Sequence, residues 1–258
     1  MSPRRPVITA GLHLESALAQ TRGATAQTPL LVAGMDEVGR GAMAGPAVVG
    51  AVAVRVPTDQ APPPVRDSKA LTDRRRRSLV PEVLDWAAAV GIGEASPAEI
   101  DEHGLSTALA LAGRRAWSVL CRNAGAEPVA LILDGRDDWL TRGTGREVVD
   151  EVPGPVPPVP QMVVKAEDQA ATVAGASITA KVYRDDLMIA LHEEFPAYGW
   201  AGNKGYGSAE HRAAIEQDGA VVHHRRSWAL PVRRVEEPAL FAWGEDTRPD
   251  DGREGAWP

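Results

Sequence analysis

The chain has 258 residues, of which 44% are hydrophobic, and its net charge at pH 7 is −7. This length suffices for one large buried core. No apolar run approaches the roughly 20 residues that a membrane-spanning helix needs, and the single cysteine, Cys121, rules out an internal disulfide framework. We therefore expect one main domain, no membrane contact and a reducing, cytoplasmic location.

The N-terminal half of the sequence predicts three helices and two strands. The expected helices cover residues 12–19, 72–83 or beyond, and 96–123, and the expected strands cover 31–36 and 47–56. Thr72 or Asp73 is a suitable cap for the second helix, and Ser96 followed by Pro97 is a suitable start for the third. We expect the arginines at 74–77 to lie on the solvated side of their helix.

The C-terminal half begins with an apolar run, 129–133, that leads into Asp134. Such a run is typical of a buried parallel strand, with the acid at the carboxyl end where α/β sheets present their sites. The segment 137–160 is rich in Gly and Pro and predicts an exposed insertion. A short strand at 162–165 and two helices, at 170–194 and 209–217, are expected to follow.

These patterns divide the chain into three parts with different charge. We expect a helix and linker at 1–28, an α/β domain at 29–235, and an acidic, disordered tail at 236–258. Residues 235–258 hold seven acidic residues and two arginines, a net charge of −5, whereas residues 201–234 hold six basic and three acidic residues, a net charge of +3. This basic strip matters more for phosphate contact than the total charge does.

The most informative motif is the segment 36–41, with the sequence Asp-Glu-Val-Gly-Arg-Gly. Asp36 ends a predicted strand and can supply a hard oxygen ligand to a divalent metal. Glu37 points to the other face of a regular strand, so it can share the site only if the strand frays there. Gly39 and Gly41 leave backbone N–H groups accessible, and Arg40 can bind a phosphate. For this segment alone, a charged surface hairpin is the alternative.

The longer segment 36–46 resembles the signature of ribonuclease HII, the type 2 ribonuclease H family. Further motifs follow in the family's order over roughly 200 residues, each weak alone and nearly independent of the others. They are the segments 67–69, 99–101, 133–135, 165–167, 176–185, 203–208 with His211, and 224–228.

The resemblance implies a ribonuclease H-like α/β fold, with a central mixed five-stranded sheet flanked by helices and a C-terminal helical part. It also implies a cluster of four carboxylates that binds two Mg²⁺ or Mn²⁺ ions. The first three positions match Asp36, Glu37 and Asp134. Two such ions activate the attacking water and stabilise the leaving 3′ oxygen. For Asp134 alone, an Asp-Gly turn at a strand end is the alternative.

The fourth carboxylate position departs from the family pattern. The family usually has Lys, a small residue and Asp, whereas this chain has Lys165, Ala166 and Glu167, with Asp168 one residue later. The spacing from Lys165 and from Ser177 selects Glu167, and Asp168 would point away in an extended segment. The extra methylene could displace an ion by about an ångström and cost on the order of a hundredfold in rate.

The resemblance also implies how a substrate is selected. The family's Gly-Arg-Gly loop and a tyrosine sense a ribonucleotide whose 3′ neighbour is a deoxynucleotide, and they match Gly39, Arg40, Gly41 and Tyr206. The chain has only four lysines among 28 basic residues, and all four lie in the motifs above. The candidate phosphate ligands are Lys69, Lys181, Arg184 and Lys204. A structural role is the alternative for Lys181, which has Arg184 and Asp185 one helical turn on, and Arg184 could instead pair with Asp185.

Three functions are compatible with the sequence. The first is a monomeric endonuclease that cuts RNA in RNA/DNA hybrids and 5′ to ribonucleotides in duplex DNA. The second is a catalytically weak or inactive hybrid-binding protein, because of Glu167. The third is a nuclease for DNA junctions, against which the recognition motifs argue. In the tail, Leu240 and Phe241 loosely resemble a short sliding-clamp anchor, for which chance occurrence is the alternative.

Overall fold

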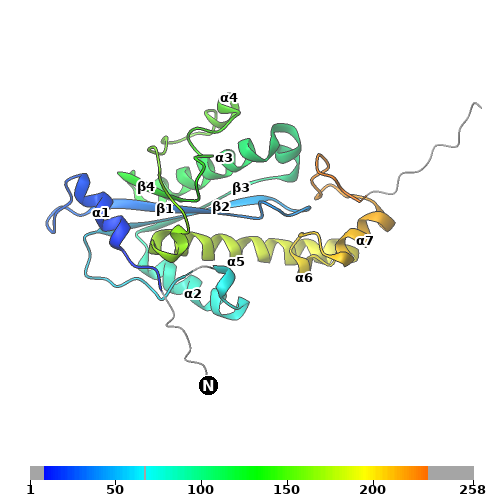
Figure 1. Cartoon of the computed structure of the whole chain (residues 1–258), viewed down its shortest axis with the longest axis horizontal. Coiled ribbons are helices and arrows are strands. Elements are labelled where there is room, and N and C mark those ends of the chain that lie inside the picture. The colour runs from blue at the N-terminus through cyan, green and yellow to red at the C-terminus, as the bar shows by residue number, and fades with distance from the viewer. Residues whose placement is uncertain (1–8, 67, 232–258) are drawn as a thin grey trace, which may run out of the picture.

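The computed structural model describes residues 9–66 and 68–231 and has a mixed five-stranded sheet at its centre (Figure 1). The order of the strands is β3-β2-β1-β4-β5. Their bounds are β1 Leu30–Val38, β2 Ala47–Val56, β3 Ala89–Ala95, β4 Ala130–Asp134 and β5 Gln161–Val163. The predicted α/β fold class and the mixed five-stranded sheet are confirmed.

The strand directions bring three strand ends together. Strand β1 is antiparallel to β2, which is antiparallel to β3, whereas β1, β4 and β5 run parallel to one another. Parallel strands end at the same edge of a sheet. Residues at the carboxyl ends of β1, β4 and β5 are therefore neighbours, although they lie far apart in the sequence.

Helices cover both faces of the sheet (Figure 1). Helix α3 packs on one face, while α2 and α5 pack on the other. Helices α6 and α7 lie at the end of α5 that is away from α1. The α-helices are α1 His13–Thr21, α2 Asp73–Trp86, α3 Pro97–Ala124, α4 Arg146–Val149, α5 Ala171–Glu194, α6 Trp200–Asn203 and α7 Ala209–Asp218, and short 3₁₀ helices are η1 Ser68–Ala70, η2 Ala166–Asp168 and η3 Pro196–Tyr198.

The predicted helix starts are confirmed by their capping bonds. The Thr72 hydroxyl accepts a bond from the Arg75 N–H at the start of α2. Ser96 and Glu99 form a reciprocal capping box at the start of α3. Each of these contacts satisfies a backbone N–H that has no partner inside its helix.

Helix α5 lies unusually close to β1 and β2, because two strand positions facing it are glycines. A Cβ atom on Gly34 would be 2.4 Å from the Thr172 hydroxyl, and one on Gly50 would be 2.3 Å from the Ala176 carbonyl oxygen. Neither distance is possible for a larger residue. The close packing places Ser177, in the second turn of α5, beside the end of β1.

Two expectations about exposure are wrong. The segment 137–160 is not simply an exposed insertion, because Trp139, Leu140 and Val149 are buried against α3. Arg76 is not solvated along its length. It donates to the carbonyl oxygens of Ser68 and Leu71, so it ties α2 to the segment before it.

The N-terminal part of the chain contacts the sheet. Within α1, Glu15 is fully buried and accepts bonds from the Thr172 N–H and hydroxyl at the start of α5.

No helix among the described residues is both long and apolar enough to span a membrane.

Candidate active site

Four acidic residues lie around the edge of the sheet where the parallel strands end. Asp36 and Glu37 lie near the end of β1, Asp134 is the last residue of β4, and Glu167 is in η2, just after β5. Asp36 and Glu167 are buried. One Asp134 oxygen accepts a hydrogen bond of 2.7 Å from the Ala166 N–H, which joins β4 to η2.

The four acids interact electrostatically. Burial raises the pKa of Asp36 to about 8, and the negative charges of Glu37, Glu167 and Asp134 contribute in that order, while a hydrogen bond from Ser177 opposes the rise. The pKa of Glu37 is also raised, mainly by burial, although Arg40 opposes this. A cation at this edge would relieve the repulsion that raises the pKa of Asp36.

Glu37 reaches the pocket without the fraying of β1 that sharing the site was expected to require. Strand β1 stays paired with β2 as far as Val38, and Glu37 lies opposite Val49. The pairing with β4 stops at Met35 instead, so the other edge of β1 is free beyond that residue. Asp36 and Glu37 both line the pocket that opens beside this free edge, although β1 stays paired with β2.

This pocket has a volume of about 540 Å³ and brings together most of the residues expected to act on substrate. Its lining includes Ser68 and Ser177, which sequence reasoning did not select. From the predicted set the lining contains Asp36, Glu37, Gly39, Arg40, Gly41, Lys69, Lys181 and Tyr206. Asp134, Glu167, Arg184 and Lys204 are not part of it.

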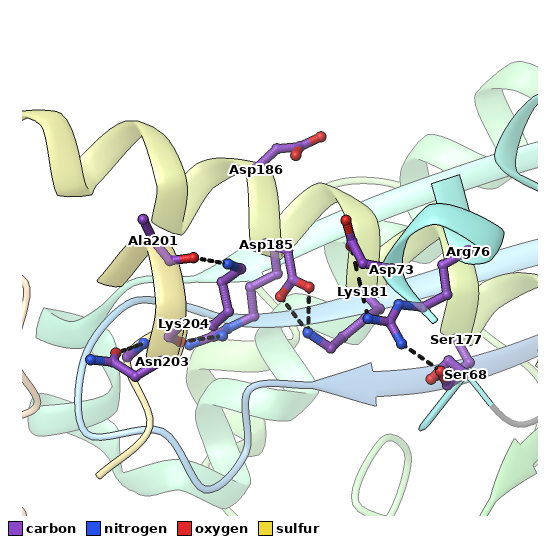
Figure 2. A network of polar contacts seen from close by, with 12 residues as sticks. Ser68, Asp73, Arg76, Ser177, Lys181, Asp185, Asp186, Ala201, Asn203 and Lys204 are labelled. Carbon is purple, nitrogen blue, oxygen red and sulfur yellow. Dashed lines mark hydrogen bonds and ion pairs between the residues drawn. The ribbon is translucent and has the colours of Figure 1, made fainter. Parts of the chain in front are cut away.

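Ser68 and Ser177 connect the pocket wall to Asp36. Ser177 bonds to the Asp36 carboxylate, and its hydroxyl lies 3.0 Å from that of Ser68 (Figure 2). Both serines are buried. They link η1, which carries Lys69, to the first acid. The only sequence signal for this link is that both serines lie inside matched motifs.

The carboxylate oxygens are suitable ligands for a divalent ion, but the carboxylates are too far apart in this structure to hold one together. Within residues 9–66 and 68–231, no three Asp, Glu, His or Cys side chains stand close enough to hold one ion. Carboxylates that carry like charge separate when no cation lies between them. Their hard oxygen atoms are the donors that Mg²⁺ and Mn²⁺ prefer.

The fourth acidic position is reached through a turn. Lys165 adopts a left-handed conformation with φ of 57°, so the chain leaves β5 and enters η2 before Glu167. The segment is therefore not extended at Glu167, and the condition on which Asp168 would point away does not hold. Glu167 is buried and its charge acts on Asp36, whereas Asp168 is exposed. These observations favour Glu167 over Asp168 as the fourth ligand.

The candidate phosphate ligands differ in their surroundings. Lys181 lines the pocket and forms an ion pair with Asp185, and burial lowers its pKa (Figure 2). Lys69 is exposed at the pocket wall. Lys204 points toward the Ala201 carbonyl oxygen (Figure 2). A phosphate role for these lysines stays a prediction.

Arg184 is not a surface phosphate ligand, and this expectation is wrong. Its side chain is fully buried, and it donates to the carbonyl oxygens of Pro46, Ala44 and Lys204 at 2.9 to 3.0 Å. Its predicted alternative partner, Asp185, pairs with Lys181 instead. A local helical pattern could not reveal these partners, because the first two lie about 140 positions away.

The predicted recognition residues lie at the rim of the pocket. Arg40 is exposed and forms a weak ion pair of 3.4 Å with Glu37. Tyr206 is 38% exposed, and its ring stacks on the Arg184 guanidinium at 5.5 Å. A ring with one face packed and part of its surface exposed can contact a sugar.

Buried histidines support the segment that carries Tyr206. His211 lies 2.9 Å from the Tyr206 carbonyl oxygen through Nδ1, and its Nε2 lies 3.1 Å from that of His224. The Trp200 indole N–H also donates to His211. Burial, and then the neighbouring His211, lower the pKa of His224 to about 4, so the pair is neutral near pH 7.

Comparison with known proteins decides the family. A sequence model of the family described as Ribonuclease HII matches residues 33–230. The chain belongs to the ribonuclease HII family. It is 41% identical over 212 residues to the ribonuclease HII of Acidovorax sp. (strain JS42), which covers 81% of this chain and 90% of that relative. The chain is therefore a ribonuclease H, an endonuclease that hydrolyses phosphodiester bonds.

Solved structures agree on the fold. The Mn²⁺ complex of Bst-RNase HIII has a TM-score of 0.60 and 24% identity, covering 84% of this chain and 71% of that one. Ribonuclease HII from Archaeoglobus fulgidus, in its complex with PCNA, has a TM-score of 0.57 and 24% identity, covering 80% of this chain and 98% of that one. The sheet and helices of ribonuclease HII described above thus match solved proteins of types HII and HIII.

Proposed function

We propose that this ribonuclease HII is a divalent-metal-dependent endonuclease that cuts the RNA strand of RNA/DNA hybrids and cuts 5′ to ribonucleotides embedded in duplex DNA. The products carry 3′-hydroxyl and 5′-phosphate ends. One observation carries the proposal: the two acids at the end of β1 and the recognition residues Gly39, Arg40, Gly41 and Tyr206 line a single pocket. A strand bound at the recognition residues thus has a phosphodiester within reach of the acids.

The residues have separate tasks in this proposal. Asp36, Glu37, Asp134 and Glu167 hold Mg²⁺ or Mn²⁺, which activates a water and stabilises the leaving oxygen when bound. Ser177 orients the Asp36 carboxylate. Neighbouring basic residues neutralise the backbone phosphates, with Lys69 and Lys181 at the pocket and Lys204 beyond it.

Substrate choice depends on the pocket rim. A 2′-hydroxyl both donates and accepts a hydrogen bond, so the backbone at residues 39–41 can recognise it. The Tyr206 ring packs against the following sugar, which must lack that hydroxyl to lie close. This division would make a lone ribonucleotide in DNA a substrate and would exclude an all-DNA duplex.

A labelled DNA duplex with one ribonucleotide tests the proposal. With Mg²⁺ or Mn²⁺ the protein should produce one cut, 5′ to the ribonucleotide, and leave a 3′ end that a polymerase extends. The all-DNA duplex should stay intact, and so should the ribonucleotide duplex in EDTA. The Asp36→Asn protein should not cut, whereas its matched control, Asp168→Asn, should. Absence of the cut in either metal, or a cut on the 3′ side, would refute the proposed activity.

A second candidate is a hybrid-binding protein with weak or no turnover. Its support is the longer Glu167 side chain, together with the spacing of acids that does not yet fit one ion in the described residues. Single-turnover cleavage across a metal titration separates the two candidates. Slow cleavage that Glu167→Asp accelerates would favour this second candidate.

The partners proposed here are the hybrid and the ribonucleotide-containing duplex, bound by a monomer in the cytoplasm. A sliding clamp is a further candidate, since the Archaeoglobus fulgidus relative was solved with PCNA. Leu240 and Phe241 lie outside the described residues. A pull-down that compares the full chain with one ending at Val235 tests the contact, and equal capture of both would exclude the tail.

A further inference from the structure

Two buried arginines lie beneath the loop at residues 39–46, which we call the recognition loop. Arg184 comes from α5, and Arg225 comes from the segment after α7. Both side chains are fully buried. Arg225 donates to the carbonyl oxygens of Gly39 at 2.7 Å, Arg40 at 3.0 Å and Gly45 at 3.1 Å. Together with the Arg184 bonds to Ala44 and Pro46, these contacts hold five of the eight loop carbonyls.

The two guanidinium groups carry positive charge that no acid neutralises by direct contact. Neither forms an ion pair within the part of the chain that the structure describes. Burial, and then the charge of Arg184, lower the pKa of Arg225 to about 9, which leaves it cationic at neutral pH. Placing two like charges below one loop costs free energy, so the arrangement points to a task beyond stability.

The N–H groups of the recognition loop point away from the two arginines and fall into two sets. The N–H groups of Met43, Ala44 and Gly45 donate to Gly205 and His223. In contrast, those of Gly39, Arg40 and Gly41 form no hydrogen bond with any described residue, and all three residues line the pocket. Successive free N–H groups form a site for an oxygen acceptor, and buried positive charge behind them strengthens it.

Arg184 also joins the two parts of the rim. Arg184 donates to the Lys204 carbonyl oxygen at 2.9 Å and stacks under the Tyr206 ring. A Cβ atom at Gly39 would lie 2.1 Å from Arg184 Nε, so the loop rests directly on this side chain. A shift of Arg184 would therefore move the loop and Tyr206 together.

We propose that Arg184 and Arg225 are positioning residues for substrate recognition. They turn the carbonyls of the recognition loop inward, so that the N–H groups of residues 39–41 face an acceptor oxygen of the nucleic-acid strand. Arg184 also fixes the distance between this loop and Tyr206. The inference rests on the proposed function, because it assigns the loop to substrate.

Arg225→Lys tests the proposal, with its exposed neighbour in Arg226→Lys as the matched control. The Arg225 bonds come from three separate nitrogen atoms, and a single ammonium nitrogen cannot reproduce that spread, so the loop should lose its fixed orientation. Binding is measured in EDTA by fluorescence anisotropy of two labelled duplexes that differ by one 2′-hydroxyl. The wild-type preference for the ribonucleotide should fall at least fivefold in Arg225→Lys and stay within twofold in Arg226→Lys.

Kinetics on the ribonucleotide duplex supply the second measurement. KM should rise at least tenfold in Arg225→Lys, with a smaller fall in kcat, because the reacting groups are untouched. A folded Arg225→Lys protein with the wild-type preference, or with a lower kcat and an unchanged KM, overturns the proposal. If circular dichroism shows that this variant does not fold, Arg184→Lys decides by the same criteria.

The two arms of the binding assay also separate the ligand sources. Selective weakening on the ribonucleotide duplex identifies the 2′-hydroxyl as the acceptor. Equal weakening on both duplexes points to a phosphate oxygen and, because the preference is then unchanged, overturns the role in ribonucleotide recognition. A wild-type protein that prefers the ribonucleotide but never cuts it would refute the proposed nuclease activity alone. Normal cutting with an unaltered Arg225→Lys preference would refute only the positioning role.

Discussion

Replacing Asp36 by Asn should stabilise the metal-free protein at neutral pH while it abolishes cleavage. The pKa of Asp36 rises from its ordinary 3.8 to about 8 on folding, so the folded state takes up a proton that the unfolded state releases. The favourable contribution is complete below pH 3.8 and is lost as the pH rises toward 8. Asn has a similar shape, keeps an oxygen for Ser177 and does not titrate.

The size of the effect follows from the distance between the two pKa values. Each pH unit above the ordinary pKa corresponds to about 1.4 kcal/mol until the folded pKa is reached. At pH 7, about three units above it, wild type should have lost about 4 kcal/mol that Asp36→Asn keeps. Near pH 4 the two proteins should have nearly equal free energies of unfolding.

Urea unfolding in EDTA, followed by tryptophan fluorescence between pH 4 and pH 8, measures this difference. Taking the difference between the two proteins cancels the titrating groups that do not interact with Asp36. Added Mn²⁺ should stabilise wild type and have little effect on Asp36→Asn. A stability difference that does not grow with pH would refute the view that burying Asp36 beside the other acids destabilises the metal-free fold.

Three further outcomes are expected. Tyr206→Ala should reduce cutting at a lone ribonucleotide about tenfold more than cutting of a long hybrid, because only the lone site depends on one deoxyribose; equal losses in parallel kinetic assays would remove that role. Glu167→Gln should lower single-turnover cleavage at least a hundredfold while Asp168→Asn is tolerated, and the reverse order would shift the ligand by one residue. His224, with its pKa lowered to about 4, stabilises the fold above pH 6.5 and loses that contribution as pH falls toward 4, so acid should lower the melting temperature of wild type more than that of His224→Asn.

The sequence revealed those parts of the fold that depend on neighbouring residues. The caps at Thr72 and Ser96 were predictable because each partner lies within four positions. The run before Asp134 was predictable because a strand buried on both faces is continuously apolar. The acids at the strand ends follow from these strands, and Asp36 and Asp134 accordingly lie at the predicted edge.

Strand β3 shows why other parts could not be predicted. Its inward positions include Gly91 and Gly93, where a Cβ atom would lie about 2 Å from carbonyl oxygens of α3. Only glycine lets α3 approach the strand this closely. Because glycine takes the place of large apolar residues at these positions, the alternation that indicates a strand is missing. The signal was absent because the packing partner is supplied by another part of the chain.

The supporting roles of Arg184, which was predicted to bind phosphate, and of Arg225, which was not selected, could not be predicted for a related reason. A basic residue in a nucleic-acid-binding motif suggests phosphate contact, and exposed arginines usually serve that purpose. Their true partners are carbonyl oxygens about 140 and 185 positions away. Nothing in the local sequence distinguishes a buried arginine that shapes a loop from an exposed one that binds a ligand.

Helix α5 fixes the distance between the acids and the support of the recognition loop. Ser177 contacts the first acid, Lys181 lines the pocket four residues later, and Arg184 supports the recognition loop after another three. These positions share one face of the helix, and a rise of 1.5 Å per residue separates the first from the last by about 10 Å. In the proposed function, two rigid helical turns would set the distance between the point of cleavage and the recognised sugar, so changes in this helix would be expected to move where the strand is cut as well as how fast.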